Sequence, residues 1–289
     1  MTIRNPAEWG VDQLRLVGAA LGSAGRAVNE TDEARKASVP VVRRIGFADL
    51  REVLGKGVAD FAACRTDVFF LVVIYPLVGL VLARLAFGYD MLPLLFPLAS
   101  GFALVGPLAG LGLYQLSRRR EQGASASLPD AFSLVRTPSF GAIVALGLLL
   151  LAIYLIWLAS ALMIYNATLG PKPPESLEIF AEDIFTTSAG WAMIIIGVGV
   201  GFLFALLVFV ISVVSFPLLL DRAVTVRTAI MTSLRAVAMN PVPMAAWGVI
   251  VVGGLVLGSI PMLLGLVFVL PVLGHATWHL YRKVVAQPG

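Results

Sequence analysis

The sequence predicts an all-α, polytopic membrane protein with about six transmembrane helices, and three observations support this fold class. First, 59% of the 289 residues are hydrophobic and only 13% are charged, with a mean hydropathy of +0.92, whereas roughly a quarter of the residues in soluble domains are charged. Second, five charge-free stretches approach or exceed the roughly 20 residues that cross a hydrocarbon layer of about 30 Å. Third, the basic residues gather on one side of these stretches.

The charge-free stretches divide into six predicted spans. Arg84, near the end of the first span, can reach the interface by snorkelling. The last stretch, Asn240–Tyr281, has 42 residues, about 63 Å of helix at a rise of about 1.5 Å per residue, so it must contain a turn. We place that turn at residues 259–261, because proline disfavours helical geometry in the preceding residue. The six spans are residues 67–87, 91–116, 140–164, 188–214, 241–259 and 262–281.

The distribution of basic residues predicts the orientation of the spans. Of the 21 Lys and Arg residues, 19 lie before the first span, in the second and fourth loops, or in the tail, and only Arg84 and Lys172 lie on the other face. Short cytoplasmic loops carry an excess of basic residues, so we expect both termini in the cytoplasm. Residues 1–66 contain no apolar stretch typical of a signal peptide.

The chain divides into a polar cytoplasmic arm, residues 1–44, which we expect to be loosely attached, and a six-span membrane domain, residues 45–285. Within the domain, each pair of spans is a hairpin that starts and finishes on the cytoplasmic side. Short segments with helical apolar spacing precede the three hairpins, at residues 47–61, 128–135 and 226–237. Amphipathic helices of this kind can lie in the membrane interface with their apolar faces down.

The spans carry little that suggests catalysis or ion transport. None has an acidic or basic residue in its central part, and charge within the hydrocarbon is kept mainly for function. A neutral pathway lined by Ser100, Ser160, Ser212 and Ser215 would still suit a permease for a neutral or lipid-like solute. No Ser-His-Asp set, paired-carboxylate site or phosphate-binding loop can be assembled from the sequence, so we do not expect an enzyme.

The two histidines of the chain, His275 and His279, are four residues apart on one face of the last span. Two imidazoles can share a metal ion, and one can bind a haem iron. No third ligand lies nearby in sequence, and the neighbouring Trp278 and Tyr281 favour an aromatic belt at the interface. We therefore expect no cofactor and no metal, and keep a haem or metal site at this pair as an alternative. The single cysteine, Cys64, excludes an internal disulfide.

Arginines at the cytoplasmic ends of two spans are candidate contacts for anionic lipid headgroups. Arg118, Arg119 and Arg120 close the second span, and Arg282 follows the last. The simpler interpretation is a positive-inside anchor. We expect this basic surface to bind membrane lipids rather than nucleic acid. Small residues such as Gly197, Gly199 and Gly201 allow close helix packing, either within the bundle or between two copies or membrane-protein partners.

Two motifs carry a family resemblance. They are Gly106–Gly123 (GPLAGLGLYQLSRRREQG) and Leu270–Arg282 (LPVLGHATWHLYR), and with them residues 45–285 resemble the family of predicted bacterial integral membrane proteins designated DUF2189. The resemblance implies a multi-pass protein of the bacterial cytoplasmic (inner) membrane. It implies no activity, substrate or catalytic residue.

These observations favour a non-catalytic, lipid-facing scaffold or accessory factor for other membrane proteins. A permease is the first alternative, and a haem- or metal-binding membrane protein is the second.

Overall fold

The computed structural model describes residues 40–63, 92–98, 100, 106, 110–124, 139–172, 174–261 and 263–287, and within these ranges every regular element is helical. The all-α prediction is therefore confirmed for the described residues. The predicted span 67–87 and the segment 128–135 lie outside them, as do ten of the 26 residues of the predicted span 91–116. The elements are α2 (Phe47–Ala63), η1 (Leu92–Leu94), α5 (Leu111–Glu121), α7 (Phe140–Thr168), α8 (Leu177–Thr186), α9 (Ser188–Ser212), α10 (Ser215–Asp221), α11 (Val226–Met239), α12 (Pro241–Ser259) and α13 (Leu266–Val284).

Three helical segments of the described chain are long and apolar enough to cross a membrane. They are Phe140–Thr168, Ser188–Asp221 and Pro241–Ser259. The first and third are α7 and α12, and the second is α9 continued into α10. These segments coincide with the third, fourth and fifth predicted spans, because a long run of apolar side chains without charge is a local property of the sequence. The sixth predicted span corresponds to α13, which begins and ends a few residues later than predicted. It is not among the three segments that are long and apolar enough to cross a membrane.

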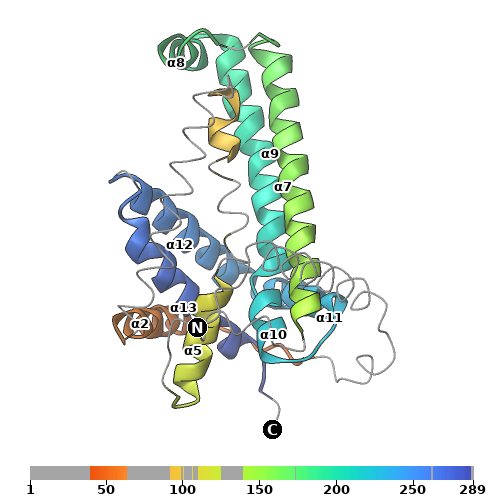
Figure 1. Cartoon of the computed structure of the whole chain (residues 1–289), viewed down its shortest axis with the longest axis vertical. Helices are drawn as coiled ribbons and strands as arrows, with labels where there is room; N and C mark the ends of the chain where they lie inside the picture. The colour runs from red at the N-terminus through yellow and green to blue at the C-terminus, as the bar shows by residue number, and fades with distance from the viewer. Residues whose placement is uncertain are drawn as a thin grey trace, which may run out of the picture.

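The helices α7 and α9 form a long antiparallel pair along the longest axis of the molecule (Figure 1). Trp157 of α7 packs on Phe204 of α9, with ring centroids 5.6 Å apart. A Cβ atom on Gly201 would lie 3.0 Å from the Trp157 ring, so glycine allows the indole to approach the α9 backbone.

A polar turn with the short helix α8 joins the far ends of α7 and α9 (Figure 1). Two side chains cap the helices that begin there. The Ser176 hydroxyl accepts the backbone N–H of Ile179 at the start of α8, and the Thr187 hydroxyl accepts that of Gly190 at the start of α9. Both caps satisfy donors that a helix leaves open at its N-terminus. Acidic residues stand around this turn at Glu175, Glu178, Glu182 and Asp183.

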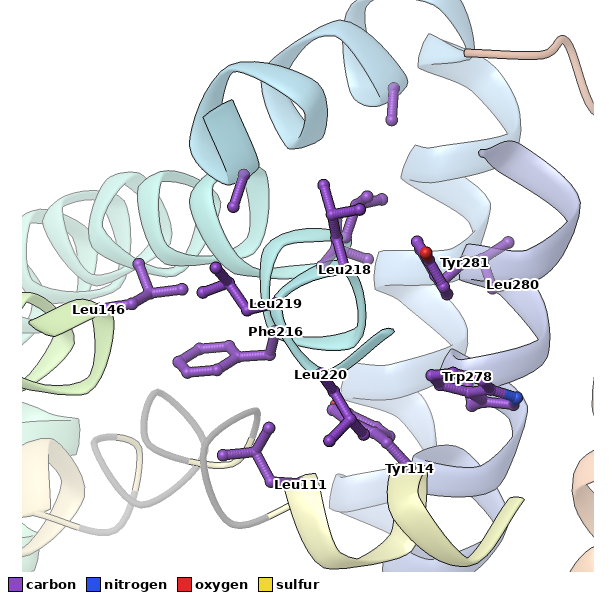
Figure 2. Packing of buried hydrophobic residues seen from close by; sticks show 14 of the residues in the cluster. Leu111, Tyr114, Leu146, Phe216, Leu218, Leu219, Leu220, Trp278, Leu280 and Tyr281 are labelled. Atoms are coloured by element: carbon purple, nitrogen blue, oxygen red, sulfur yellow. The ribbon is translucent and has the colours of Figure 1, made fainter. Parts of the chain in front are cut away.

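The main core lies at the opposite end, around the short helix α10. Its residues Phe216, Leu218 and Leu219 are completely buried. Figure 2 shows Phe216 and Leu219 pointing toward Leu146 of α7, while Trp278, Leu280 and Tyr281 of α13 stand on the other side of α10. A seven-residue helix thus joins the long α7–α9 pair to the rest of the described molecule.

The helix α2 packs along α13, and the two ends of the described chain meet beside them. A Cβ atom on Gly57 would lie 2.7 Å from both the Cβ of Ala276 and the carbonyl oxygen of Val272, so only glycine permits this closeness. Val42 forms an isolated antiparallel bridge with Val285. Asn240, between α11 and α12, accepts the backbone N–H of Ile45 at 2.8 Å and so holds this segment in place.

The two predicted amphipathic segments that the structure describes are both helices. Residues 47–61 lie in α2 and residues 226–237 in α11. Both helices stand near the end of the molecule that is opposite α8 (Figure 1).

Candidate functional site

Charged and polar residues from four helices gather where α5 meets α13, and we call this set the polar junction. Its members are Asp60 of α2; Ser117, Arg118, Arg120 and Glu121 of α5; Asp221 and the adjoining Arg222 at the end of α10; and His275, Trp278, His279, Tyr281 and Arg282 of α13. Gly274 permits the approach of α5, because a Cβ atom there would lie 2.5 Å from Leu113. The stretches that carried the family resemblance, Gly106–Gly123 and Leu270–Arg282, therefore meet in space.

Asp60 is the centre of the more deeply buried half of the polar junction. Its Oδ2 atom accepts the Ser117 hydroxyl at 2.6 Å and lies 2.8 Å from Nε2 of His279. Its Oδ1 atom lies 3.4 Å from the Arg120 Nε. The Ser117 hydroxyl is also 2.7 Å from Nδ1 of His275, and both of these side chains are completely buried. These contacts hold α2 against both α5 and α13.

The surroundings of Asp60 keep its carboxylate ionised. Burial by itself raises the pKa of the Asp60 carboxyl, but hydrogen bonds from His279 and Ser117 outweigh burial, and the pKa lies below its ordinary value. A buried carboxylate with several donors is stable only while those donors remain in place. The ionised Asp60 side chain is therefore stable only while α5 and α13 are packed against α2, and its contacts in turn hold these helices together.

The second half of the polar junction is an ion-pair network around Asp221 and Glu121. The Asp221 carboxylate accepts the Tyr281 hydroxyl at 2.6 Å, and the Nε atoms of Arg118 and Arg222 each lie 3.7 Å from it. Glu121 accepts the Arg282 Nε at 2.9 Å and the Trp278 indole N–H at 3.1 Å. The network joins the ends of α5, α10 and α13.

The structure places the predicted histidine pair inside the protein. His275 is fully buried, and so are Trp278 and Tyr281, so the aromatic-belt interpretation does not hold for these three residues. The reason is that α2 and α5 cover this face of α13. Over the described ranges no group of three or more His, Cys, Asp or Glu residues is arranged to hold a metal ion. The absence of a cofactor at the pair stays a prediction, and a haem or metal site there stays its alternative.

The polar junction contains a Ser-His-Asp set that the sequence did not reveal, since Ser117, His275 and Asp60 come from three helices. Its order differs from that of a hydrolase triad, in which the imidazole lies between the carboxylate and the hydroxyl. Here Ser117 lies between His275 and Asp60, and its hydroxyl is completely buried. The arrangement is suited to joining helices.

The candidate headgroup arginines are engaged within the protein. Arg118 pairs with Asp221, Arg120 with Asp60, and Arg282 with Glu121. Arg119 also has an interaction partner. Their lipid-binding role stays a prediction, and it would have to use donors that these partners leave open.

Sequence reasoning did not single out the arginines that point outward from α11. Arg227 and Arg235 are exposed, and the exposed apolar residues Met231 and Leu234 lie between them on the same face. No ion pair or hydrogen bond of either guanidinium occurs among the described residues. Their spacing was visible in the sequence, but the direction in which this face points was not.

The comparisons with known proteins agree with a membrane location. No curated protein and no solved structure matches the chain. The DUF2189 family, described as predicted integral membrane proteins, matches residues 95–221. The match contains the first predicted motif, Gly106–Gly123, and ends before the second. Together with the long apolar helices, it identifies an integral membrane protein that, over residues 95–221, is similar to the DUF2189 family, as its sequence predicted.

Proposed function

We propose that the protein is a non-catalytic, lipid-facing scaffold or accessory factor of the bacterial inner membrane. In this proposal both termini lie in the cytoplasm, anionic lipids are the direct partners, and a membrane protein or a second copy is the assembly partner. The helices α2 and α11 then lie at the cytoplasmic face, and α8 lies on the opposite side.

The observation that carries the proposal is the exposure of α9. In the most apolar 18-residue window of the segment Ser188–Asp221, only 6% of the residues are buried within the molecule. Side chains as large as Ile195, Phe202 and Leu203 are more than 60% exposed. Surface of this kind is stable against lipid chains or another apolar helix, which suits a protein that works by contact along its sides.

Charge at the proposed cytoplasmic face supports anionic lipid as the partner. On α11, Arg227 and Arg235 flank Met231 and Leu234, so one face offers apolar side chains to the interface and guanidinium groups to headgroups. Each basic residue near an anionic leaflet contributes about 1 kcal/mol of attraction. The paired arginines of the polar junction have part of this charge neutralised by carboxylates.

Lipid retention tests the proposal. The double variant Arg227→Gln, Arg235→Gln should lower the amount of phosphatidylglycerol and cardiolipin that co-purifies in mild detergent, because both guanidinium groups are unpaired in the described structure. Lys172→Gln, on the face that carries α8, is the matched control and should leave the lipid unchanged. Equal lipid in all three proteins would contradict the role of α11.

A flux measurement separates the scaffold from the permease. The purified protein in liposomes should move no solute in a saturable manner. Saturable flux that is reduced by Ser212→Ala, inside the molecule, more than by the α11 variant would replace the scaffold with a permease.

A further inference from the structure

We infer that α12 and α13 form a re-entrant hairpin, which enters the bilayer from the side of α2 and α11, turns within the hydrocarbon at residues 260–261 and 263–265, and contacts lipid acyl chains with its tip. Hydropathy alone predicted that the two helices both cross the membrane. The inference rests on the membrane placement proposed above, and it does not depend on the scaffold role.

The tip of this hairpin is apolar and exposed. Between Val251 and Gly274 the only polar side chain is Ser259. At the tip, Ile260 is 72% exposed and Leu264 is 66% exposed. The turn between α7 and α9 is the opposite, since it contains Lys172 and the acidic residues of α8. If the turn between α12 and α13 reached the water on the α8 side, its large apolar side chains would be exposed to that water, and the turn has no charged residue.

Much of the described backbone of the turn is hydrogen-bonded internally, as a water-free environment requires. The N–H groups of Leu263, Leu264 and Leu266 each donate to a carbonyl within the turn, at 3.0 to 3.1 Å. The Ser259 hydroxyl donates to the Leu255 carbonyl at 2.7 Å. Backbone groups in hydrocarbon must be satisfied internally, because there is no water to hydrogen-bond with them.

Close packing allows the turn to be this tight. A Cβ atom on Gly265 would lie 2.8 Å from the Cα of Gly258, so two glycines bring the ends of α12 and α13 into contact. Leu263 adopts a φ of 68°, a left-handed conformation that a non-glycine residue rarely takes. The leucine side chain keeps the tip apolar at a position where most turns carry glycine or asparagine.

Although α12 by itself is long enough to cross, the distance along α13 from the polar junction to the tip is too short for a crossing. His275 is linked through Ser117 to Asp60, which pairs with Arg120, and charged groups belong at or outside the edge of the hydrocarbon. Above them, α13 continues only from Gly274 to Leu266, nine residues or about 14 Å at a rise of about 1.5 Å per residue. The hydrocarbon is about 30 Å thick, so the tip reaches about the middle of the bilayer.

The arrangement of the helices agrees with this depth. Figure 1 shows α12 and α13 inclined to the long axis, with their tip ending part of the way along the α7–α9 pair. The 29 residues of α7 extend about 43 Å, enough for a full crossing. The outer side of α12 is lined by Val242, Val249, Val252 and Val256, all more than half exposed, so the apolar surface of the tip continues along one arm.

Depth measurements on the full chain test the inference. In a Cys64→Ser background, single cysteines at Leu264, Val198 and Ser176 are labelled with an environment-sensitive fluorophore and reconstituted in phosphatidylglycerol and phosphatidylethanolamine vesicles. Val198, exposed near the middle of α9, is the standard for the bilayer centre, and Ser176 is the standard for water. The Leu264 label should be quenched by lipids brominated near the chain ends as strongly as the Val198 label, and iodide should not quench it.

Two outcomes would overturn the inference. Quenching of the Leu264 label by iodide, to the extent seen at Ser176, would show a complete crossing. Quenching by neither reagent would show that protein covers the tip. The placement itself is tested separately in intact cells, where an impermeant maleimide should label a cysteine at Ser176 and not one at Thr225. The reverse pattern would overturn the orientation without affecting the measured depth of the tip.

Discussion

The helices α2 and α11 have the same amphipathic pattern in the sequence, yet their fully buried faces are made of different residues. The buried face of α2 contains Leu50 and Val53, together with Gly57 and Asp60, and it lies against α13. The buried face of α11 consists of Ala229, Thr232, Ser233 and Ala236, while Met231 and Leu234 point outward.

The difference shows that an amphipathic pattern specifies two faces and leaves their use open. On α2, glycine and a buried carboxylate make close packing on α13 more favourable than contact with lipid. On α11, small residues and hydroxyl groups fit against the end of α9. Ser233 donates to the Val210 carbonyl at 2.7 Å and accepts the Val214 N–H at 3.3 Å. It therefore satisfies the backbone where α9 gives way to α10.

The largest effect is expected at the contact between α2 and α13. Gly57→Leu would force a side chain into Ala276 and the Val272 backbone, and overpacking typically costs about 1–3 kcal/mol, occasionally more. The thermal stability of the purified protein in detergent should fall sharply. Gly55→Leu in the same helix is the control, because nothing lies within 4 Å of that position and leucine favours a helix over glycine by nearly 1 kcal/mol. A similar loss in both variants would indicate a general defect of α2 rather than the close packing.

Removal of the buried carboxylate should have the next largest effect. Asp60→Ala leaves Ser117 and His279 without their acceptor, and buried unsatisfied groups cost about 1–3 kcal/mol each. We expect a lower midpoint of chemical unfolding and faster amide exchange in α2. Glu52→Ala, which removes an exposed partner of Lys56 and Lys283, should change the midpoint little. An unchanged midpoint for Asp60→Ala would show that the polar junction does not hold α2.

On the packed face of α11, loss of a single hydroxyl group should reduce stability less than loss of the Asp60 carboxylate. Ser233→Ala removes a donor to Val210 and an acceptor for Val214, a loss of about 1–2 kcal/mol. The midpoint of unfolding should decrease by less than for Asp60→Ala. Thr228→Ala, at a partly buried position of the same helix, provides a comparison. A greater loss at Thr228 would indicate that Ser233 does not stabilise the break between α9 and α10.

The smallest effect on stability is expected on the outward face of α11. Leu234→Ser should change the free energy of unfolding in detergent by no more than about 0.5 kcal/mol, as for other surface positions. The same change should increase the accessibility of an α11 spin label to water-soluble reagents in vesicles, because the leucine holds this face in the interface. By contrast, Leu50→Ser on α2 should lower the free energy of unfolding, because Leu50 is buried in the protein. Strong destabilisation by Leu234→Ser would mean that protein, and not lipid, covers this face.

The sequence by itself determined the parts of this protein that depend on local composition. Hydropathy identified the helices at residues 140–164, 188–214 and 241–259, and proline placed the turn that follows Ser259. These features are predictable because a chain in hydrocarbon must satisfy its backbone within each helix. Apolar periodicity likewise identified the helices α2 and α11.

Tertiary structure alone decided which faces are covered. The sequence placed His275 in an interfacial belt, and packing of α2 and α5 buried it. Arginines proposed for lipid headgroups are paired with carboxylates, and Asp60 meets His279 across 219 positions of the chain. Contacts between residues so distant in sequence leave no local periodicity, because they depend on how whole helices pack. The sequence therefore specified the helices, and their packing decided which side chains remain available to lipid.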